Sequence, residues 1–213
     1  MMSLPLSGST DDERTPAPES ADWRTLPLAA ILPFDRNAKT MSLADVVYLP
    51  ESPAHDAEIE AINEEAFGPG RFVRAAYKIR EGGPHERALS FVAVDGETVV
   101  ASVRMTRVAA GEGRALMLGP LAVRPTYKNR GIGRRLVAIA LQEAAKAGHR
   151  AVVLVGDEPY YGPLGFRKIP RGQISMPRPV DPDRVLSHEI VPGAVAKLTG
   201  MVHHADTREP VEA

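Results

Sequence analysis

The segment from Val123 to Leu136, VRPTYKNRGIGRRL, constrains the fold more than any other part of the chain. An apolar run precedes it, and residues 133–147 have the period of an amphipathic helix. Gly131 and Gly133 therefore mark a turn from a strand into a helix. The first amides of a helix have no intrahelical partner and favour negative charge, so this arrangement predicts a binding site for phosphate.

Basic side chains crowd this glycine turn. They are Arg124, Lys128, Arg130, Arg134 and Arg135. Two nucleotide-binding motifs can be tested by their spacing. The P-loop string G-x-x-x-x-G-K-S/T does not occur, and the dinucleotide string G-x-G-x-x-G has only its first two glycines. The turn alone leaves two interpretations open, a site for a small anionic ligand or a helix start with a solvated basic face.

The strand before the turn, LMLGPLAVRP, contains Gly119-Pro120 near its centre. Because proline donates no ladder hydrogen bond, this pair predicts a bulge that separates the strand from its parallel neighbour. An extended ligand could enter such an opening and pair with the freed backbone groups. A phosphate-rich head at the helix start and an extended arm between two strands together describe coenzyme A.

Residues Leu118 to Phe166, LGPLAVRPTYKNRGIGRRLVAIALQEAAKAGHRAVVLVGDEPYYGPLGF, resemble the Gcn5-related N-acetyltransferase (GNAT) superfamily. The resemblance is greatest to bacterial acetyltransferases with a GDPxYYxxFGF-like segment. The acetyl-CoA motif of the family, Q/R-x-x-G-x-G/A, corresponds to residues 128–133, where a lysine replaces the usual Gln or Arg. The resemblance implies the GNAT fold, a mixed α/β domain with a mostly antiparallel twisted sheet, splayed parallel strands and flanking helices.

The resemblance also implies site residues. Backbone groups of Leu121, Ala122 and Val123 would hold the pantetheine arm and the thioester carbonyl, with the Val123 N–H as the expected donor to the oxyanion. The pyrophosphate would lie on the amides of seven residues, Lys128, Asn129, Arg130, Gly131, Ile132, Gly133 and Arg134. Tyr161, four residues before Gly165, would be the catalytic acid. Without the resemblance, Tyr161 is better interpreted as an aromatic side chain that packs the helix onto the sheet.

The general base is not assigned by the sequence. Glu64 and Glu65 fall near the end of the first expected helix, and Asp157 and Glu158 follow the central strand. Each of these four is more typical of a solvated helix residue or a cap. Tyr160, next to the expected acid, fits packing or a wall of the substrate site.

The absence of cysteine narrows the chemistry. With no thiol in 213 residues, a disulfide, a thiolate metal site and an acyl-cysteine intermediate are excluded, which predicts direct transfer in a ternary complex. HERAL and HEIVPG miss the H-E-x-x-H zinc pattern, so we expect no metal. The composition fits a reducing cytoplasm, and we see neither a secretory signal nor a membrane-spanning run.

The charge balance bears on the class of partner. Lys plus Arg number 26 and Asp plus Glu 27, whereas a dedicated nucleic-acid-binding protein is usually basic. The leading hypothesis is an N-acetyltransferase, monomer or homodimer, with acetyl-CoA as donor and an amine of a small molecule or a protein as acceptor. The alternatives are a non-catalytic acyl-CoA-binding regulatory module and, less favoured, nucleic-acid binding through the basic cluster.

The pattern along the chain predicts one compact domain between two tails. Residues 1–40 are expected to form a disordered tail and an irregular arm, 41–200 the acetyltransferase domain and 201–213 a C-terminal tail. The expected order of elements is β-α-α-β-β-β-α-β-α-β-β, with a hairpin at Asp95-Gly96. The last two strands are expected over FRKI, residues 166–169, and HEIVPGAVA, residues 188–196.

Overall fold

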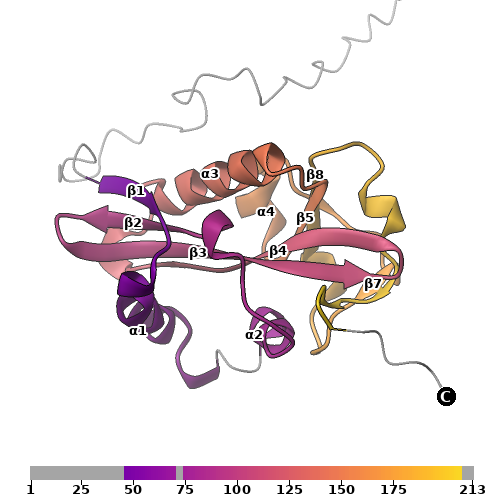
Figure 1. Ribbon diagram of the computed structural model, residues 1–213, viewed down its shortest axis with the longest axis horizontal. Coiled ribbons are helices and arrows are strands. Elements are labelled where there is room, and N and C mark those ends of the chain that lie inside the picture. The colour runs from indigo at the N-terminus through magenta and orange to yellow at the C-terminus, as the bar shows by residue number, and fades with distance from the viewer. Residues whose placement is uncertain (1–45, 71–73, 208–213) are drawn as a thin grey trace, which may run out of the picture. The chain divides into compact units, whose positions relative to one another are not determined.

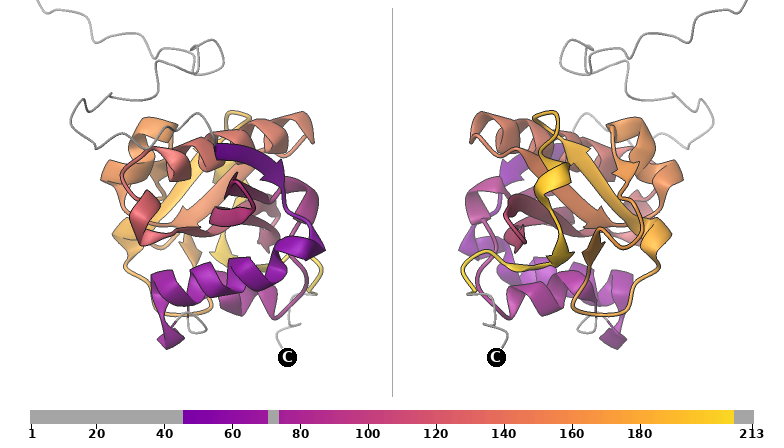
Figure 2. Two further views of the ribbon diagram at one scale, coloured as in Figure 1. Left: turned by 90° about the vertical axis from the view of Figure 1, so that its left-hand side faces the viewer. Right: turned by 90° about the vertical axis from the view of Figure 1, so that its right-hand side faces the viewer.

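The computed structural model describes residues 46–70 and 74–207 (Figure 1). The expected tail and arm of residues 1–40 lie outside these ranges. The described part is a mixed α/β fold in which one eight-stranded sheet lies between two layers of helices (Figures 1 and 2).

The large sheet has the strand order β1-β2-β3-β4-β5-β8-β6, and β10 also pairs with β3. Its strands are β1 (Val46–Pro50), β2 (Phe91–Asp95), β3 (Thr98–Ala110), β4 (Gly113–Val123), β5 (Ala151–Val155), β6 (Arg167–Lys168), β8 (Val185–Glu189) and β10 (His203–His204). Within this sheet β4 and β5 run parallel and the other neighbours antiparallel. Two short strands, β7 (Ile174–Ser175) and β9 (Gly200–Met201), pair with each other in a second sheet.

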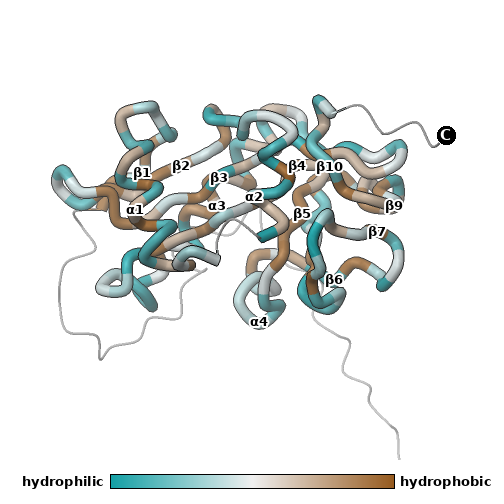
Figure 3. Tube along the Cα trace, turned by 90° about the horizontal axis from the view of Figure 1, so that it is seen from below, coloured by the Kyte–Doolittle hydropathy of each residue, from teal (hydrophilic) through white to brown (hydrophobic). Residues whose placement is uncertain are grey.

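The helices cover both faces of the large sheet. Helices α1 (Asp56–Phe67) and α2 (Ala75–Arg80) lie on one face, and α3 (Ile132–Lys146) and α4 (Glu158–Tyr161) on the other (Figure 1). Hydrophobic stretches follow β4 and β5 through the centre, as Figure 3 shows. Covering both faces explains why β5 is a continuous apolar run rather than an alternating one.

Local patterns correctly predicted the hairpin and the long helix. The β2–β3 turn contains Gly96 with a φ of 60°, a left-handed conformation that glycine adopts without strain. Helix α3 begins one residue before the predicted start at Gly133. It buries the predicted apolar arc, which consists of Leu136, Val137, Ala140, Leu141 and Ala144.

The predicted bulge at Gly119-Pro120 is present in β4. Val103 of β3 lies opposite Leu121 and Met105 opposite Leu118, so two residues of β4 face the single residue between them. The parallel pairing of β4 with β5 is restricted to Leu116↔Val152 and Met117↔Val153. The two strands therefore separate where the bulge begins. This opening, between residues 118–123 of β4 and residues 154–155 of β5, is the β4–β5 gap.

The C-terminal part differs from the prediction. The strand expected over residues 188–196 is β8, which instead ends at Glu189, because Ile190 and Val191 turn away and donate to the Arg150 carbonyl. The strand over FRKI is reduced to the two-residue edge strand β6. Beyond residue 200, where a tail was expected, β10 pairs with β3 and its His204 side chain is buried.

Candidate functional site

The glycine turn joins the end of β4 to the start of α3. Asn129 and Gly131 have φ angles of 61° and 80°, and these left-handed residues redirect the chain into the helix. The first intrahelical bond runs from the Arg135 N–H to the Gly131 carbonyl at 3.0 Å. The amides of residues 132–134 therefore precede the helical ladder, which makes them available to an anion.

Two tyrosine rings hold basic side chains beside this turn. The guanidinium carbon of Arg130 lies 5.3 Å from the ring centre of Tyr127, and that of Arg134 lies 5.3 Å from the ring centre of Tyr160. Such stacking leaves the guanidinium N–H groups able to donate to phosphate oxygens. Lys128 is exposed. The predicted basic side chains of residues 128, 130 and 134 are therefore present at the turn, two of them stacked on tyrosine rings.

The Arg124 side chain, also predicted to be part of the basic cluster, contacts β3 and α1. Its Nε donates to the Val99 carbonyl at 2.9 Å, and its guanidinium pairs with Glu65 at 3.3 Å and with Glu58 at 3.8 Å. Arg124 thus ties the end of β4 to β3 and α1. Glu65, one of the candidate general bases named from the sequence, therefore forms an ion pair with Arg124.

The other acidic candidates also hold elements together. Asp157 pairs with Arg184 at 3.1 Å, and Glu158 pairs with Lys168 at 3.5 Å. Both contacts anchor α4 to the strands that follow it. Both carboxylates are exposed to solvent, with 71% of the Asp157 side chain and 42% of the Glu158 side chain accessible.

The three residues expected to hold the pantetheine arm line one side of the β4–β5 gap. Leu121, Ala122 and Val123 pair with β3 along one edge, and their other edge lies beyond the last residues that β4 pairs with β5. An unpaired strand edge presents N–H and C=O groups to any extended chain placed beside it. The backbone groups on the edge of β4 that faces the gap are therefore open to an extended ligand.

Tyr161 packs at the end of β5. A Cβ placed on Gly156 would lie only 2.3 Å from Cε2 of Tyr161, so glycine is required for the ring to lie there. The ring also contacts Phe166 and Tyr160 edge-on, with centroids 5.7 Å and 4.8 Å away. Burial raises the pKa of Tyr161, so its hydroxyl keeps its proton at neutral pH. These contacts fit both the packing interpretation and the expected acid.

Tyr160 has a closer relation to the glycine turn than its sequence position indicated. A Cβ placed on Gly133 would lie 2.6 Å from the Tyr160 hydroxyl oxygen, 3.3 Å from Cγ2 of Val123 and 3.6 Å from Cδ2 of Leu121. The hydroxyl thus lies between the start of α3 and the end of β4. Burial raises the pKa of Tyr160, and the Arg134 charge partly offsets this. No sequence signal could have located this contact, because it depends on how α4 packs against α3.

A buried ion-pair network supports the bulge from the α1 side. Arg104, the residue opposite the bulge, is 7% exposed and donates to the Glu51 carboxylate at 3.0–3.2 Å. His85 Nε2 lies 2.8 Å from the same carboxylate, and Arg87 donates to it at 3.1 Å. Arg104 also reaches Asp56 at 3.1 Å. The network fixes the end of β1 and the start of α1 against β3.

This network should make stability depend on acidic pH. Burial would raise the pKa of Glu51, but hydrogen bonds from His85 and Arg104 outweigh it and lower the pKa from 4.5 to about 2. A carboxylate with a depressed pKa stabilises the fold fully above its unfolded pKa, and the contribution is lost as the pH falls through the folded value. We expect this group alone to remove roughly 3 kcal/mol of unfolding free energy between pH 4.5 and 2.

Urea unfolding at a series of pH values tests this expectation. Glu51→Gln should lower the free energy of unfolding at pH 7. It should also flatten the acid limb, which is the fall in this free energy between pH 4.5 and 2. Glu97→Gln, at an exposed carboxylate, should leave the limb as in the wild type. Equal acid limbs for the wild type and Glu51→Gln would contradict the assignment.

In residues 46–70 and 74–207, no group of three or more His, Asp or Glu side chains is arranged to hold a metal ion. None of the helices in the same ranges is long and apolar enough to cross a membrane.

A mixed sheet opened between two parallel strands, beside a basic glycine turn, is the architecture of the GNAT class. The family model described as acetyltransferase (GNAT) family matches residues 56–166, and the chain belongs to that family. Among curated proteins it is 27% identical over 158 residues to the uncharacterized N-acetyltransferase YhbS of Escherichia coli K12, covering 72% of this chain and 93% of YhbS. The predicted family and fold class are therefore confirmed.

Solved structures give the same result. The crystal structure of YhbS from Escherichia coli in complex with CoA has a TM-score of 0.65 at 24% identity, covering 79% of this chain and 94% of that one. A GNAT family acetyltransferase from Brucella melitensis in complex with acetyl-CoA has a TM-score of 0.50 at 30% identity, covering 57% and 82%. The first likeness supports the fold, and the second adds a relative that binds acetyl-CoA.

Proposed function

We propose that this protein transfers the acetyl group of acetyl-CoA directly to a primary amine. The observation that carries the proposal is the juxtaposition of the β4–β5 gap with the basic glycine turn of α3. The gap would take the extended pantetheine arm of acetyl-CoA, and the glycine turn would take its pyrophosphate. Membership of the GNAT family and the CoA and acetyl-CoA complexes of two relatives support it.

The binding roles follow from where the chain offers donors. The amides of residues 128–134 would hold the pyrophosphate, with Lys128, Arg130 and Arg134 adding charge-assisted hydrogen bonds. The backbone of Leu121, Ala122 and Val123 would hold the pantetheine arm as an added strand does. Because backbone amides would make most of the pyrophosphate contacts, the side chain at position 128 would matter less for binding. A lysine can therefore replace the usual Gln or Arg there.

The transfer step needs two hydrogen-bond donors. The neutral amine nitrogen forms a bond to the acetyl carbon while the carbon–sulfur bond breaks, and the amine gives up one proton to solvent. The Val123 N–H would stabilise the negative charge that develops on the carbonyl oxygen. The Tyr161 hydroxyl would give its proton to the departing sulfur and regain one from solvent. The products are the N-acetyl amine and the free CoA thiol.

A second candidate function keeps the binding site and omits the reaction. The contacts of Tyr161 with Gly156 and Phe166 would serve equally to pack α4 in a regulatory module that only binds acyl-CoA. Such a module would bind acetyl-CoA and release no thiol in the presence of amines.

Calorimetric titration with acetyl-CoA is the first test, with ATP and NAD as controls. We expect saturable binding of acetyl-CoA and none of the controls at the same concentration. A thiol-release assay over a panel of amines then separates the enzyme from the regulatory module, and the absence of cysteine keeps its background low. A folded sample that fails to bind acetyl-CoA would overturn the proposal.

A further inference from the structure

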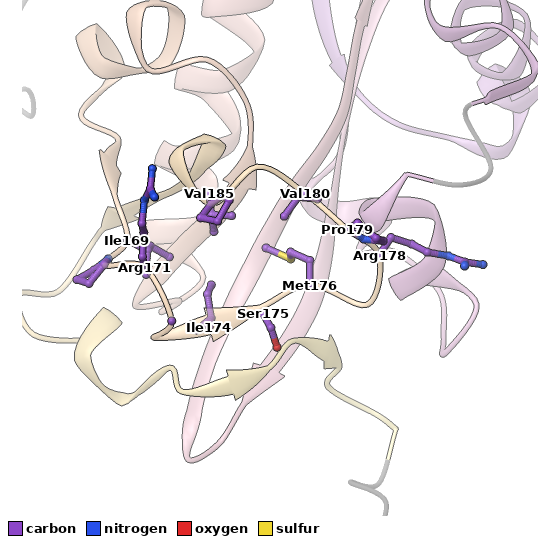
Figure 4. Close-up of a pocket in the computed structure, with 12 residues that line it drawn as sticks. Ile169, Arg171, Ile174, Ser175, Met176, Arg178, Pro179, Val180 and Val185 are labelled. Atoms are coloured by element: carbon purple, nitrogen blue, oxygen red, sulfur yellow. The ribbon is translucent and has the colours of Figure 1, made fainter.

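A second opening lies on the α2 face of the sheet, away from the glycine turn. It is a pocket of about 310 Å³ between β8 and the segment that carries β7 (Figure 4). Its walls are mostly aliphatic, with Ile169, Ile174, Met176, Val180 and Val185 turned toward its centre. Pockets of this size that are largely apolar and carry a few polar groups are typical of small-molecule sites.

The pocket adjoins the β4–β5 gap from the side opposite the cofactor turn. Val185 pairs with Val155, which lies beyond the last residue that β5 pairs with β4. Val155 and Ala76 of α2 pack in the hydrophobic cluster that contains Val185, and a Cβ placed on Gly119 would lie 3.8 Å from that of Ala76. One lining residue, Val185, thus pairs with the β5 border of the gap, and Ala76 of the same cluster lies beside its β4 border.

The glycine turn lies on the face of the sheet opposite the pocket, as the directions of the β4 side chains indicate. Leu121 and Val123 point toward Gly133 of α3, whereas Ala122 packs with Ile59 and Ile62 of α1. A donor bound at the turn and a molecule bound in the pocket would therefore approach the same gap from opposite faces. This arrangement allows a direct transfer in a ternary complex.

The charged side chains that line the pocket are both basic. The lining includes Arg171 and Arg178 and no carboxylate. Arg171 is neutralised by an ion pair with Asp183. Arg178 is exposed, and within residues 46–70 and 74–207 no carboxylate pairs with it. In Figure 4 the two arginines extend to opposite sides of the apolar centre. Among the described residues, Arg178 is therefore the one cation lining this apolar cavity with which no carboxylate pairs.

We propose that this pocket binds the acceptor, and that the acceptor is a primary amine with an apolar side chain and a carboxylate, as in a hydrophobic amino acid. The inference rests on the proposed function. The apolar side chain fills the cavity and the carboxylate pairs with Arg178. A polycationic acceptor is repelled by the same charge.

Thiol release measured with matched amines tests the proposal. Leucine is compared with 3-methylbutylamine, which lacks only the carboxylate, and with glycine and spermidine. Arg178→Gln should lower kcat/KM for leucine about tenfold and leave that for 3-methylbutylamine within about twofold. Arg150→Gln, at an exposed arginine away from the pocket, should change neither value. The wild-type-to-variant ratio for each amine cancels the differences in amine basicity.

A second variant tests the cavity rather than the charge. Val180→Trp would fill the apolar space from its partly exposed rim. We expect kcat/KM for leucine to fall at least about tenfold, with glycine affected much less. Equal effects on both amines would overturn the assignment of the cavity.

Failure of this inference can be distinguished from failure of the proposed function. Acetyl-CoA binding is measured by calorimetry on every sample. Absent binding overturns the proposed function itself. Retained binding with a preference for spermidine or 3-methylbutylamine over leucine overturns only the acceptor class. If no amine is acetylated, N-acetylleucine is titrated into the CoA-saturated protein, and absent binding also overturns the acceptor class.

Discussion

Gly133→Val is expected to weaken acetyl-CoA binding by at least about a hundredfold. Gly133 lies in the first turn of α3, and even a methyl group there would lie within 2.6 Å of the Tyr160 hydroxyl and 3.3 Å of Val123. A branched side chain must displace the Tyr160 ring and the Val123 side chain, or shift the first turn of α3 with the amides that would hold the pyrophosphate. Calorimetric titration of the variant with acetyl-CoA measures the effect.

Gly162→Ala is the matched control for this substitution. Gly162 has a φ of −55°, and a Cβ there would lie 3.8 Å from Glu158, so alanine fits without strain. We expect wild-type affinity for Gly162→Ala. Thermal unfolding of both variants separates a local effect on the turn from loss of the fold. Wild-type affinity in Gly133→Val would show that the ligand does not use this turn.

Tyr161→Phe is expected to lower kcat by about 10²- to 10⁴-fold while the affinity for acetyl-CoA changes little. The substitution removes the proton that the leaving sulfur would take and keeps the ring that packs against Gly156 and Phe166. Steady-state thiol release gives kcat, and calorimetry gives the affinity. A regulatory module would show no turnover in either protein.

Tyr160→Phe is the companion substitution, because the Tyr160 hydroxyl lies at the turn itself. We expect it to weaken acetyl-CoA binding severalfold and to lower kcat much less than Tyr161→Phe. The reverse result, with the larger loss of kcat in Tyr160→Phe, would transfer the acid role from Tyr161 to its neighbour. The two substitutions remove the same atom, so their comparison is free of differences in packing volume.

The local patterns of the sequence were sufficient for the elements nearest the proposed cofactor site. The hairpin at Asp95-Gly96, the bulge at Gly119-Pro120 and the apolar arc of α3 were all predicted, and all are present. Each depends on residues close together in the chain, since turn glycines, prolines and helical periodicity act over a few residues. The roles of Tyr161 and Val123 came from the family resemblance and stay predictions.

The less regular C-terminal part was predicted less well. The apolar letters of HEIVPGAVA favoured a strand, yet β8 lies over Val185–Glu189. Its limits follow from pairing with β5, which ends where Ile190 and Val191 donate to the Arg150 carbonyl instead. Such pairing joins residues far apart in the chain, and local propensity does not encode it.

The sequence by itself therefore determined the strand–turn–helix unit with its basic charge, the break in the strand before it and the exclusion of cysteine chemistry. Only the tertiary structure decided that the Tyr160 hydroxyl reaches Gly133, that Arg104 and Glu51 meet opposite the bulge, and that an apolar pocket adjoins the gap from the α2 face. The physical reason is the distance along the chain over which each kind of interaction acts. Turn and helix signals act between near neighbours in the chain, whereas burial, ion pairing and cavity shape depend on which distant segments pack together.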